Sequence, residues 1–395
     1  MKYFWSRFKF LKFKDFLSIF ALLLVLLPAL IVKIFVRDLW LICEDENEAR
    51  DNGYWLFKYI RETYPKQKCF YAINKKSVDY KKVKDLGKII SFGSLSHWFW
   101  YIVADKNISS QKNGKPNSAL CYLLEVGLGF RKKNRYFLQH GVTINDVEFL
   151  HYKNTKMYRF CTSTLQEHKF ITDTFCYKKN QIVLTGLARF DHLNNDNLDR
   201  KLILCMPTWR NWIAREVECE RYEGTTDFVK TNYFTCWNNF LHSEKLQKFL
   251  QDNDYTMIFY PHRNMQKYIQ DFNVNFERII IGNAKNFDVQ DLLKRASLLI
   301  TDYSSVFFDF AYLGKPIIFY QFDEEKFRQG QYKKGYFNYK DTELAYWTDN
   351  LDGICSILNS HKDQIGKIDI ETPKKYFKYI DTNNCERIYR MIKEK

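Results

Sequence analysis

The chain has 395 residues, of which 46% are hydrophobic and 18% aromatic, with only 15 glycines and 7 prolines. This composition excludes a disordered chain, and the length suits about two domains. The formal net charge of +15 favours an anionic partner, namely a nucleotide, a phosphate polymer, a lipid surface or a nucleic acid, although a lysine-rich solubilising surface would give the same value.

The first element is an apolar run over 16–32, interrupted by Ser18 and Pro28 and preceded by a tail of interleaved basic and aromatic residues. Its length is close to the roughly 20 residues that cross a bilayer. No small-residue cleavage site follows it, which argues against a signal peptide, and basic residues flank both ends, so the positive-inside rule selects no orientation. We expect residues 1–36 to form a membrane-associating segment, either a monotopic or re-entrant anchor bent at Pro28 or a single span.

Strand-like apolar runs alternate with helical stretches along the rest of the chain. The first set of strands lies at 38–43, 68–73, 88–92, 135–139, 158–162 and 182–185, and the second at 201–205, 255–259, 278–281, 298–300 and 316–320. Segments 46–64 and 288–294 suit helices. This alternation predicts an α/β fold with two doubly wound, Rossmann-type domains. An Asn- and Asp-rich seam at 190–200 places the domains at 37–195 and 196–395, with the ligand site expected in a cleft between them.

The ten cysteines form no C-x-x-C pair and accompany no paired histidine motif. Cys43 and Cys205 lie inside apolar runs, which is typical of buried, reduced side chains and not of a disulfide framework or a zinc site. The acidic pair Asp252 and Asp254 has the spacing of a metal-binding motif but precedes a strand in a polar loop. We therefore expect no metal site.

Four polar clusters follow predicted strands. They are Gln139-His-Gly-Val-Thr143, Met206-Pro-Thr-Trp-Arg210, Tyr260-Pro-His-Arg-Asn264 and Thr301-Asp-Tyr-Ser-Ser305, the last with Asp309 one turn further on. Two histidines, an arginine and a serine-rich helix start are what phosphoryl transfer needs, because histidine can deprotonate an incoming hydroxyl and fixed donors can stabilise the phosphoryl oxygens. Each cluster also has a structural interpretation: Ser304 or Ser305 as a helix cap, Arg210 stacked on Trp209, and Asp309 stabilising its own helix.

With these clusters in this order, the chain resembles the CDP-glycerol glycerophosphotransferases of teichoic-acid and capsule synthesis. The matching motifs are Trp40–Glu44, Glu48–Gly53, Phe57–Ile60, His140-Gly141, Thr185–Asp191, Pro207–Arg210, Pro261-His262, Thr301–Asp309, Lys315–Tyr320 and Asp323. The resemblance implies a GT-B fold that transfers glycerol phosphate from CDP-glycerol to a hydroxyl of a membrane- or lipid-linked acceptor and releases CMP. It implies a membrane-facing acceptor domain at 37–195 and a CDP-glycerol-binding domain at 196–395.

The resemblance also assigns roles to individual residues. His140 is expected to be the catalytic base, and His262 a second essential histidine near the donor pyrophosphate. Gly141, Arg210, Pro261, Thr301, Ser304, Ser305 and Asp309 are expected to contact the donor. No cofactor is implied. Because a nucleotide donor is cytosolic, the resemblance places the enzyme on the cytoplasmic face of the cell membrane.

One departure bears on the acceptor. The first histidine is followed by Gly-Val-Thr143 where relatives often have Gly-Thr-Pro, so the acceptor stays open, as does the choice between primase and polymerase. Alternative functions are the same fold using CDP-ribitol or a nucleotide sugar, and a non-catalytic membrane protein that binds an anionic polymer. Nucleic-acid binding is disfavoured because the basic residues are dispersed and no nucleic-acid motif is present.

Overall fold

The computed structural model describes residues 13–130, 134–217, 221–224 and 227–394, and the chain divides into two compact units. The first comprises Met1–Val142, Val147–His192 and Asp381–Lys395, and the second comprises Thr143–Asp146 and Leu193–Ile380. The crossing after His192 falls inside the Asn- and Asp-rich seam. The expected second domain, 196–395, differs at its end, because the last segment of the chain belongs to the first unit.

The first unit contains a seven-stranded parallel sheet in the order β3-β2-β1-β4-β5-β6-β7. Its strands are β1 (Trp40–Ile42), β2 (Cys69–Ile73), β3 (Lys88–Ser91), β4 (Lys106–Ser109), β5 (Arg135–Phe137), β6 (Arg159–Thr162) and β7 (Ile182–Leu184). Its helices include α3 (Asn52–Thr63), α4 (Tyr80–Val83), α5 (Leu95–Val103), α6 (Ser118–Tyr122), α7 (Tyr152–Thr155), α8 (Leu165–Thr174) and α15 (Asn384–Lys393). The strand order reverses between β1 and β4, which is where such sheets bind ligands.

Helix α15 returns to the first unit because its start is bound there. The backbone N–H groups of Asn384 and Cys385 donate to the Asp191 carboxylate at 2.8 and 2.7 Å. Tyr389 of the same helix stacks on Tyr64 with ring centroids 3.9 Å apart. No local pattern in the last segment predicted these distant partners.

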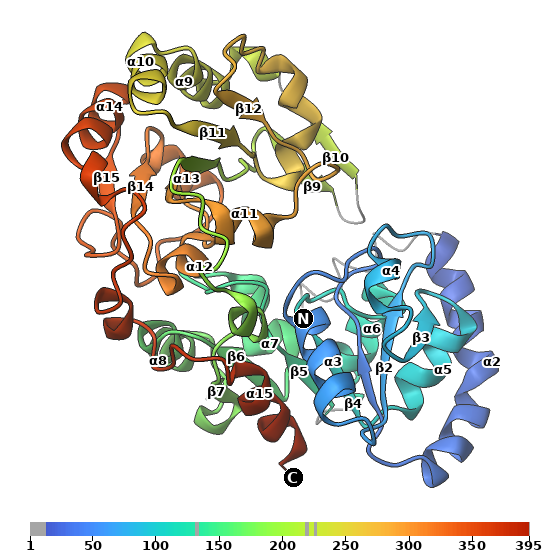
Figure 1. Cartoon of the computed structure of the whole chain (residues 1–395). Coiled ribbons are helices and arrows are strands. Elements are labelled where there is room, and N and C mark those ends of the chain that lie inside the picture. The colour runs from blue at the N-terminus through green and yellow to red at the C-terminus, as the bar shows by residue number, and fades with distance from the viewer. Residues whose placement is uncertain (1–12, 131–133, 218–220, 225–226, 395) are drawn as a thin grey trace. The chain divides into compact units, whose positions relative to one another are not determined.

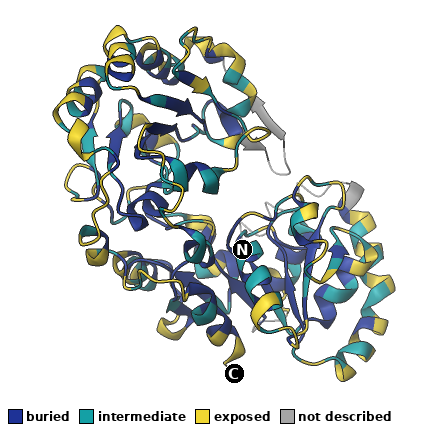
Figure 2. Ribbon diagram, viewed as in Figure 1, coloured by how far each residue is buried: buried dark blue, intermediate teal, exposed yellow. Residues whose placement is uncertain are grey.

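The second unit contains a six-stranded parallel sheet in the order β12-β11-β8-β13-β14-β15, with a reversal between β8 and β13. Its strands are β8 (Leu202–Met206), β11 (Thr256–Phe259), β12 (Ile279–Ile281), β13 (Leu298–Thr301), β14 (Ile317–Tyr320) and β15 (Tyr346–Thr348). Strands β9 (Ala214–Val217) and β10 (Arg221–Gly224) pair antiparallel in a separate two-stranded sheet. Its helices include α9 (Asn232–Leu241), α10 (Glu244–Asp252), α11 (Val289–Arg295), α12 (Phe307–Tyr312), α13 (Glu324–Gly330) and α14 (Leu351–Ser360). Figure 1 labels these elements, and Figure 2 shows that the central strands of each sheet are buried while the outer faces of the helices are exposed.

The predicted α/β class with two doubly wound sheets is confirmed, and each predicted strand is present within a residue or two of its expected ends. Strands β4 and β15 of the two sheets, and the paired strands β9 and β10, were not predicted. Strand β4 is short and polar, but it pairs with β1 and β5, and its buried Asn107 donates its side-chain amide to the carbonyl of Tyr101 at 3.2 Å. Cys43 and Cys205 are buried as expected, and burial raises the pKa of both thiols.

The N-terminal apolar segment forms one helix, α2 (Phe13–Phe35), which continues through Pro28. The predicted bend into a re-entrant anchor is therefore wrong. By length and composition Asp15–Phe35 could cross a membrane, and only 11% of its most apolar part is buried. The basic and aromatic tail before it lies outside the described residues.

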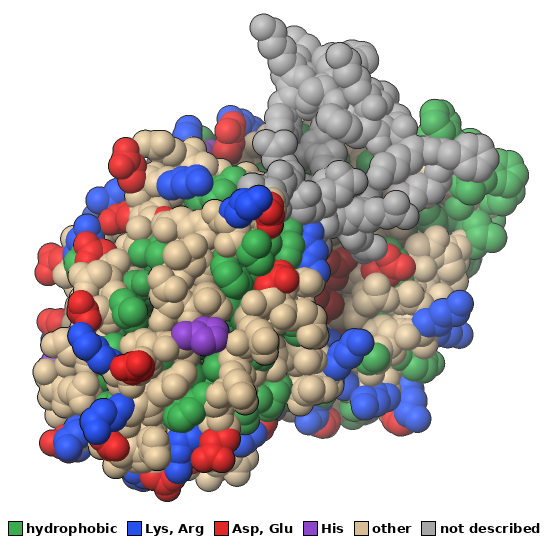
Figure 3. Space-filling model, turned by 90° about the horizontal axis from the view of Figure 1, so that it is seen from above, with side chains coloured by type: hydrophobic (Ala, Val, Ile, Leu, Met, Phe, Trp, Pro, Cys, Tyr) green, Lys and Arg blue, Asp and Glu red, His purple; other side chains and the backbone are tan. Residues whose placement is uncertain are grey.

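One side of α2 packs along α5 (Figure 1). At one end Asn117 donates to Asp15 at 2.7 Å, and at the other Lys33 donates to the Val103 carbonyl at 3.0 Å. The opposite side exposes large apolar side chains, for example Leu23 at 64% and Leu27 at 68%. Hydrophobic side chains gather at the right of Figure 3, the side on which α2 lies in Figure 1.

Candidate functional site

His140 lies just beyond β5, at the carboxyl edge of the first sheet. The preceding residue, Gln139, has a left-handed backbone with φ of 67°, an uncommon conformation that turns the chain away from the strand. Two hydrogen bonds hold this turn. The Gln139 side-chain amide donates to Glu167 at 2.7 Å, and the Gln139 backbone carbonyl accepts from the Asn52 side chain at 2.7 Å. The His140 side chain is thereby presented on the surface, with 65% of its area exposed.

A buried carboxylate orients the His140 ring. Asp51, the N-cap of α3, places Oδ2 2.6 Å from His140 Nδ1, and its Oδ1 accepts from Arg189 at 2.7 Å. Arg189 also donates to the His140 carbonyl at 2.6 Å. The Gln111 amide lies 2.7 Å from the same ring nitrogen.

Electrostatics in this group favour a charged pair. Burial raises the pKa of Asp51, but the neighbouring His140 and Arg189 outweigh burial and lower it overall. Desolvation lowers the pKa of His140, but the charge and hydrogen bond of Asp51 raise it above the usual value for histidine. Because the ionised Asp51 accepts, Nδ1 keeps its proton when the His140 ring is neutral, and Nε2 is then the basic nitrogen.

A second carboxylate fills the N-terminus of α3. The fully buried Glu44 accepts the backbone N–H groups of Arg50, Asp51 and Tyr54 at 3.0, 3.1 and 2.8 Å. Burial, and after it the charge of Asp51, raises the pKa of Glu44 to about 8. In many Rossmann folds the turn after the first strand receives a phosphate. Here the Glu44 carboxyl group, which its raised pKa keeps mostly protonated at neutral pH, already occupies these N–H groups, so the first unit offers no free phosphate site there.

In the second unit three of the predicted clusters meet, because they follow the adjacent strands β11, β8 and β13. The His262 N–H donates to the Pro207 carbonyl at 3.0 Å, and the His262 ring is stacked near Trp209 with centroids 6.2 Å apart. Its Nδ1 accepts from the Asn264 N–H at 3.3 Å. The Thr208 N–H donates to Asp302 at 2.8 Å, which joins the β8 cluster to the β13 cluster.

Arg210 has a structural role in this conformation, contrary to the prediction that it contacts a donor phosphate. The side chain has no exposed area, and Nε and Nη2 donate to the two oxygens of Asp323 at 2.8 and 2.9 Å. Nη2 also lies 2.9 Å from Asp302 Oδ2. The alternative of stacking on Trp209 is not observed either: the guanidinium lies over Tyr233, at 5.1 Å, and other rings of the core. The two carboxylates neutralise the guanidinium charge, and these bonds join the loops that follow β8, β13 and β14.

The remaining predicted donor contacts divide by exposure. Thr301 is fully buried and donates to the Met206 carbonyl at 2.7 Å, and Asp309 is 1% exposed in the first turn of α12. Ser304 and Ser305 are half-buried beside the reversal of strand order. Neither serine caps α12: the N-cap residue is Val306, and Ser304 Oγ accepts the Val306 N–H at 3.4 Å, before the helix begins.

Pro261 is buried and Gly141 is half-buried, so both contribute backbone only. Each unit thus brings its own polar groups together, and the expected meeting of the two histidines at one ligand stays a prediction.

Sequence reasoning missed Asp51, Gln111, Arg189 and Glu44 as site residues. Three of them lie inside the matching motifs, Glu44 in Trp40–Glu44, Asp51 in Glu48–Gly53 and Arg189 in Thr185–Asp191, which was the available signal. Among the described residues, no group of three acidic, histidine or cysteine side chains is arranged to hold a metal ion.

Comparison with solved structures gives the fold class. The wall teichoic acid polymerase TagF aligns with a TM-score of 0.65 over 91% of this chain and 91% of that one, at 18% identity. The UDP-GlcNAc 2-epimerase of Methanocaldococcus jannaschii aligns with a TM-score of 0.53 at 12% identity. At these identities the likeness establishes the fold alone. With two Rossmann-type units and polar groups at the carboxyl edge of each sheet, the chain has the TagF-like GT-B fold.

Sequence comparison narrows the class to a family. The sequence profile of the CDP-Glycerol:Poly(glycerophosphate) glycerophosphotransferase family matches residues 29–394, and the chain belongs to that family. The minor teichoic acid biosynthesis protein GgaB of Bacillus subtilis (strain 168) is 29% identical over 370 residues, which is 91% of this chain and 40% of GgaB. The teichoic acid poly(glycerol phosphate) polymerase of Bacillus spizizenii is 26% identical over 69% of this chain and 71% of the relative. The chain thus spans well under half the length of GgaB.

Proposed function

We propose that the protein transfers glycerol phosphate from CDP-glycerol to a hydroxyl of a membrane- or lipid-linked glycan or polyol-phosphate acceptor, releasing CMP. Family membership supports the reaction class. The observation that carries the proposal is the His140–Asp51 pair, because it is a surface-presented imidazole with its tautomer fixed by a buried carboxylate. A general base needs this arrangement.

Nε2 of His140 takes the proton of the acceptor hydroxyl while its oxygen forms a bond to the phosphorus that bears the glycerol. The bond from that phosphorus to the bridging oxygen breaks, and CMP leaves with the electron pair. Asp51 stabilises the resulting imidazolium through the Nδ1 hydrogen bond.

We assign donor binding to the second unit. Its strand reversal has half-buried serines, Ser304 and Ser305, and the His262 ring on neighbouring loops. The corresponding turn of the first unit is filled by Glu44. His262 is proposed to neutralise charge on the departing phosphate, while Arg210, Thr301 and Asp309 hold the loops that carry these groups.

Single substitutions test the two histidines. We expect His140→Ala and His262→Ala each to abolish CMP release from CDP-glycerol while circular dichroism and thermal unfolding remain unchanged. His242→Ala is the matched control, because this histidine is exposed and its ring nitrogens hydrogen-bond to the backbone carbonyls of Asn238 and Asn273. Retained activity in both histidine variants would remove the mechanism.

CDP-ribitol is the second candidate donor, because the ribitol-phosphate polymerase TarL of Staphylococcus aureus is 25% identical over 61% of this chain. A panel of CDP-glycerol, CDP-ribitol and UDP-sugars separates the cases, since a sugar transferase would release UDP. If no donor shifts the melting temperature while an anionic cell-wall polymer binds in a salt-dependent way, the protein is a non-catalytic polymer-binding protein.

We further propose that the protein lies on the cytoplasmic face of the cell membrane, with α2 embedded on one side only. The packing of α2 along α5 supports a monotopic anchor, because a helix bound along its length to a folded unit leaves just the other side for lipid. Replacing Leu23 and Leu27 with Asp should move the protein from the membrane fraction to the supernatant. Ile370→Asp, at a residue 65% exposed in the second unit, is the control and should leave the distribution unchanged.

A further inference from the structure

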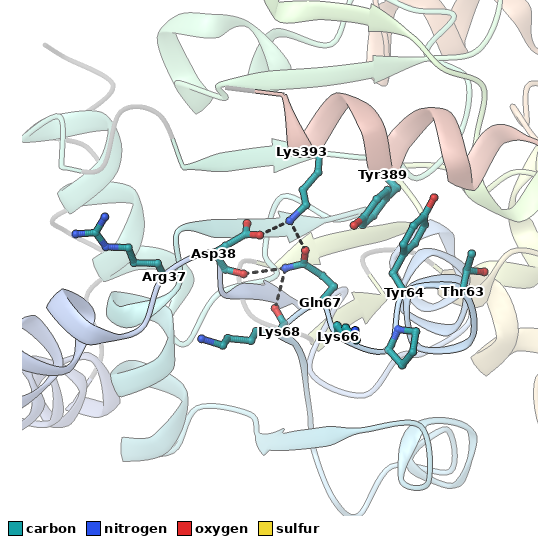
Figure 4. A pocket seen from close by; sticks show the side chains of 10 residues that line it. Arg37, Asp38, Thr63, Tyr64, Lys66, Gln67, Lys68, Tyr389 and Lys393 are labelled. Atoms are coloured by element: carbon teal, nitrogen blue, oxygen red, sulfur yellow. Dashed lines mark hydrogen bonds and ion pairs between the residues drawn. The ribbon is translucent and has the colours of Figure 1, made fainter.

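A pocket of about 420 Å³ opens at the amino edge of the first sheet (Figure 4), whereas His140 follows the carboxyl end of β5. Its wall comes from the segment after α2, the end of α3, the start of β2 and the end of α15. The lining residues are Arg37, Asp38, Thr63, Tyr64, Pro65, Lys66, Gln67, Lys68, Tyr389 and Lys393. No step of the proposed reaction uses this pocket.

The floor of the pocket is a fixed polar network. Gln67, which is 6% exposed, donates to the Asp38 carbonyl at 2.8 Å and accepts from Lys393 at 2.8 Å. Lys393 also pairs with the Asp38 carboxylate. Asp38 has a left-handed backbone with φ of 55°, held by its N–H bond to Asp105 at 2.6 Å and by the Trp40 indole at 2.9 Å. Figure 4 shows Lys393 reaching down from α15 to this network.

Three further cations surround the floor. Arg37, Lys66 and Lys68 are exposed, and among the described residues none of their side chains has an ion pair or hydrogen bond. With Lys393 they contribute four positive charges against one from Asp38, so the lining has a net charge of +3. The carboxyl ends of α3 and α15 lie here too, and each adds about half a negative charge. The pocket stays positive after that correction and suits an anion.

The pocket adjoins the proposed anchor. Helix α2 ends at Phe35, and Arg37 is the first lining residue. The last two residues of the helix, Ile34 and Phe35, expose 65% and 78% of their area. The stacked rings of Tyr64 and Tyr389 form an aromatic wall of the kind found at the headgroup level of membranes. An acyl chain against the end of α2 would therefore place its phosphate at the pocket.

We propose that this pocket binds the phosphate of an anionic membrane lipid and so fixes the depth and orientation of the protein on the bilayer. The proposal rests on the membrane association proposed for α2. A basic residue near an anionic membrane strengthens binding about fivefold, so Arg37, Lys66 and Lys68 together should contribute about 100-fold at low salt.

Vesicle flotation tests the proposal with the full chain. The pocket variant carries Arg37→Gln, Lys66→Gln and Lys68→Gln. The control variant carries Lys75→Gln, Lys76→Gln and Lys81→Gln, which removes the same charge at the opposite end of β2 and in α4. We expect the pocket variant to bind vesicles containing 30% phosphatidylglycerol 10- to 100-fold more weakly, and the control variant less than threefold more weakly. Binding to pure phosphatidylcholine vesicles, which reports α2 alone, should be equal for all three proteins.

Several results would overturn the proposal. An equal loss in both variants would mean diffuse electrostatic attraction without a pocket. Tight binding of soluble glycerol phosphate to the wild-type protein, lost in the pocket variant while vesicle binding is unchanged, would assign the pocket to a free phosphate ligand. CMP release with a soluble acceptor analogue should be unaffected in the pocket variant, so failure of this site and failure of the transferase mechanism are distinguishable.

Discussion

Replacing Asp51 with Asn should change both the rate and the pH dependence of the reaction. The carboxylate lies 2.6 Å from His140 Nδ1 and raises the pKa of that imidazole. Opposite charges about 4 Å apart interact by about 4 kcal/mol at an effective dielectric constant near 20. Because 65% of the His140 side chain faces water, solvent screening reduces this interaction to about 1 to 2 kcal/mol.

The direction of the pH effect follows from the role of the base. Neutral His140 is the active form, so kcat/KM rises with pH through the raised pKa of this group. Asp51→Asn removes the charge that raises the pKa of His140, so the rising limb should move to lower pH. The plateau should fall about 10- to 100-fold, because the ring is less well oriented and is a weaker base.

The assay is CMP release from CDP-glycerol between pH 5 and 9, with Glu386→Gln as the control. Glu386 is also a carboxylate of the first unit, but it accepts from Tyr59 and Tyr64 and not from a histidine. The control should move neither the limb nor the plateau. A plateau loss in Asp51→Asn without a shift of the limb would refute a general-base role for His140.

Three further predictions address the other groups. The double change Ser304→Ala and Ser305→Ala should raise KM for CDP-glycerol about 10- to 100-fold, because hydrogen bonds to a charged phosphate are lost. The melting temperature should not change. An unchanged KM in donor titrations would exclude the serines from the donor site. Arg210→Ala should lower the free energy of unfolding, measured in urea, by about 3 to 5 kcal/mol, since Asp302 and Asp323 remain buried without a cation. If the variant is instead as stable as the wild type and has a raised KM, Arg210 contacts the donor phosphate. Glu44→Gln should remove a pH dependence of stability. Burial raises the folded pKa of Glu44 from 4.5 to about 8, so the wild type loses up to about 5 kcal/mol of stability as pH rises between those values. Parallel curves for both proteins in urea titrations would contradict this.

Much of the fold could be predicted because its signals are local. A buried parallel strand is a short apolar run, and each run that carried this pattern became a strand of one of the two sheets. The ends of three of these strands, β8, β11 and β13, were also marked locally, by Pro207, Pro261 and Asp302. Since the carboxyl ends of parallel strands share one edge, the sequence alone grouped the β8, β11 and β13 clusters correctly.

Side-chain roles depended on partners far along the chain. Arg210 looked like a phosphate ligand until its partner Asp323, 113 positions away, was found in the core. Asp51 was not singled out in the sequence, and only the fold places it against His140, 89 positions away. The length and spacing of apolar residues determine strands and helices, so the sequence by itself determined the two sheets and the edges where chemistry could occur. Only the tertiary structure decided which charges are neutralised inside and which face a ligand, because burial and pairing arise from contacts between distant segments.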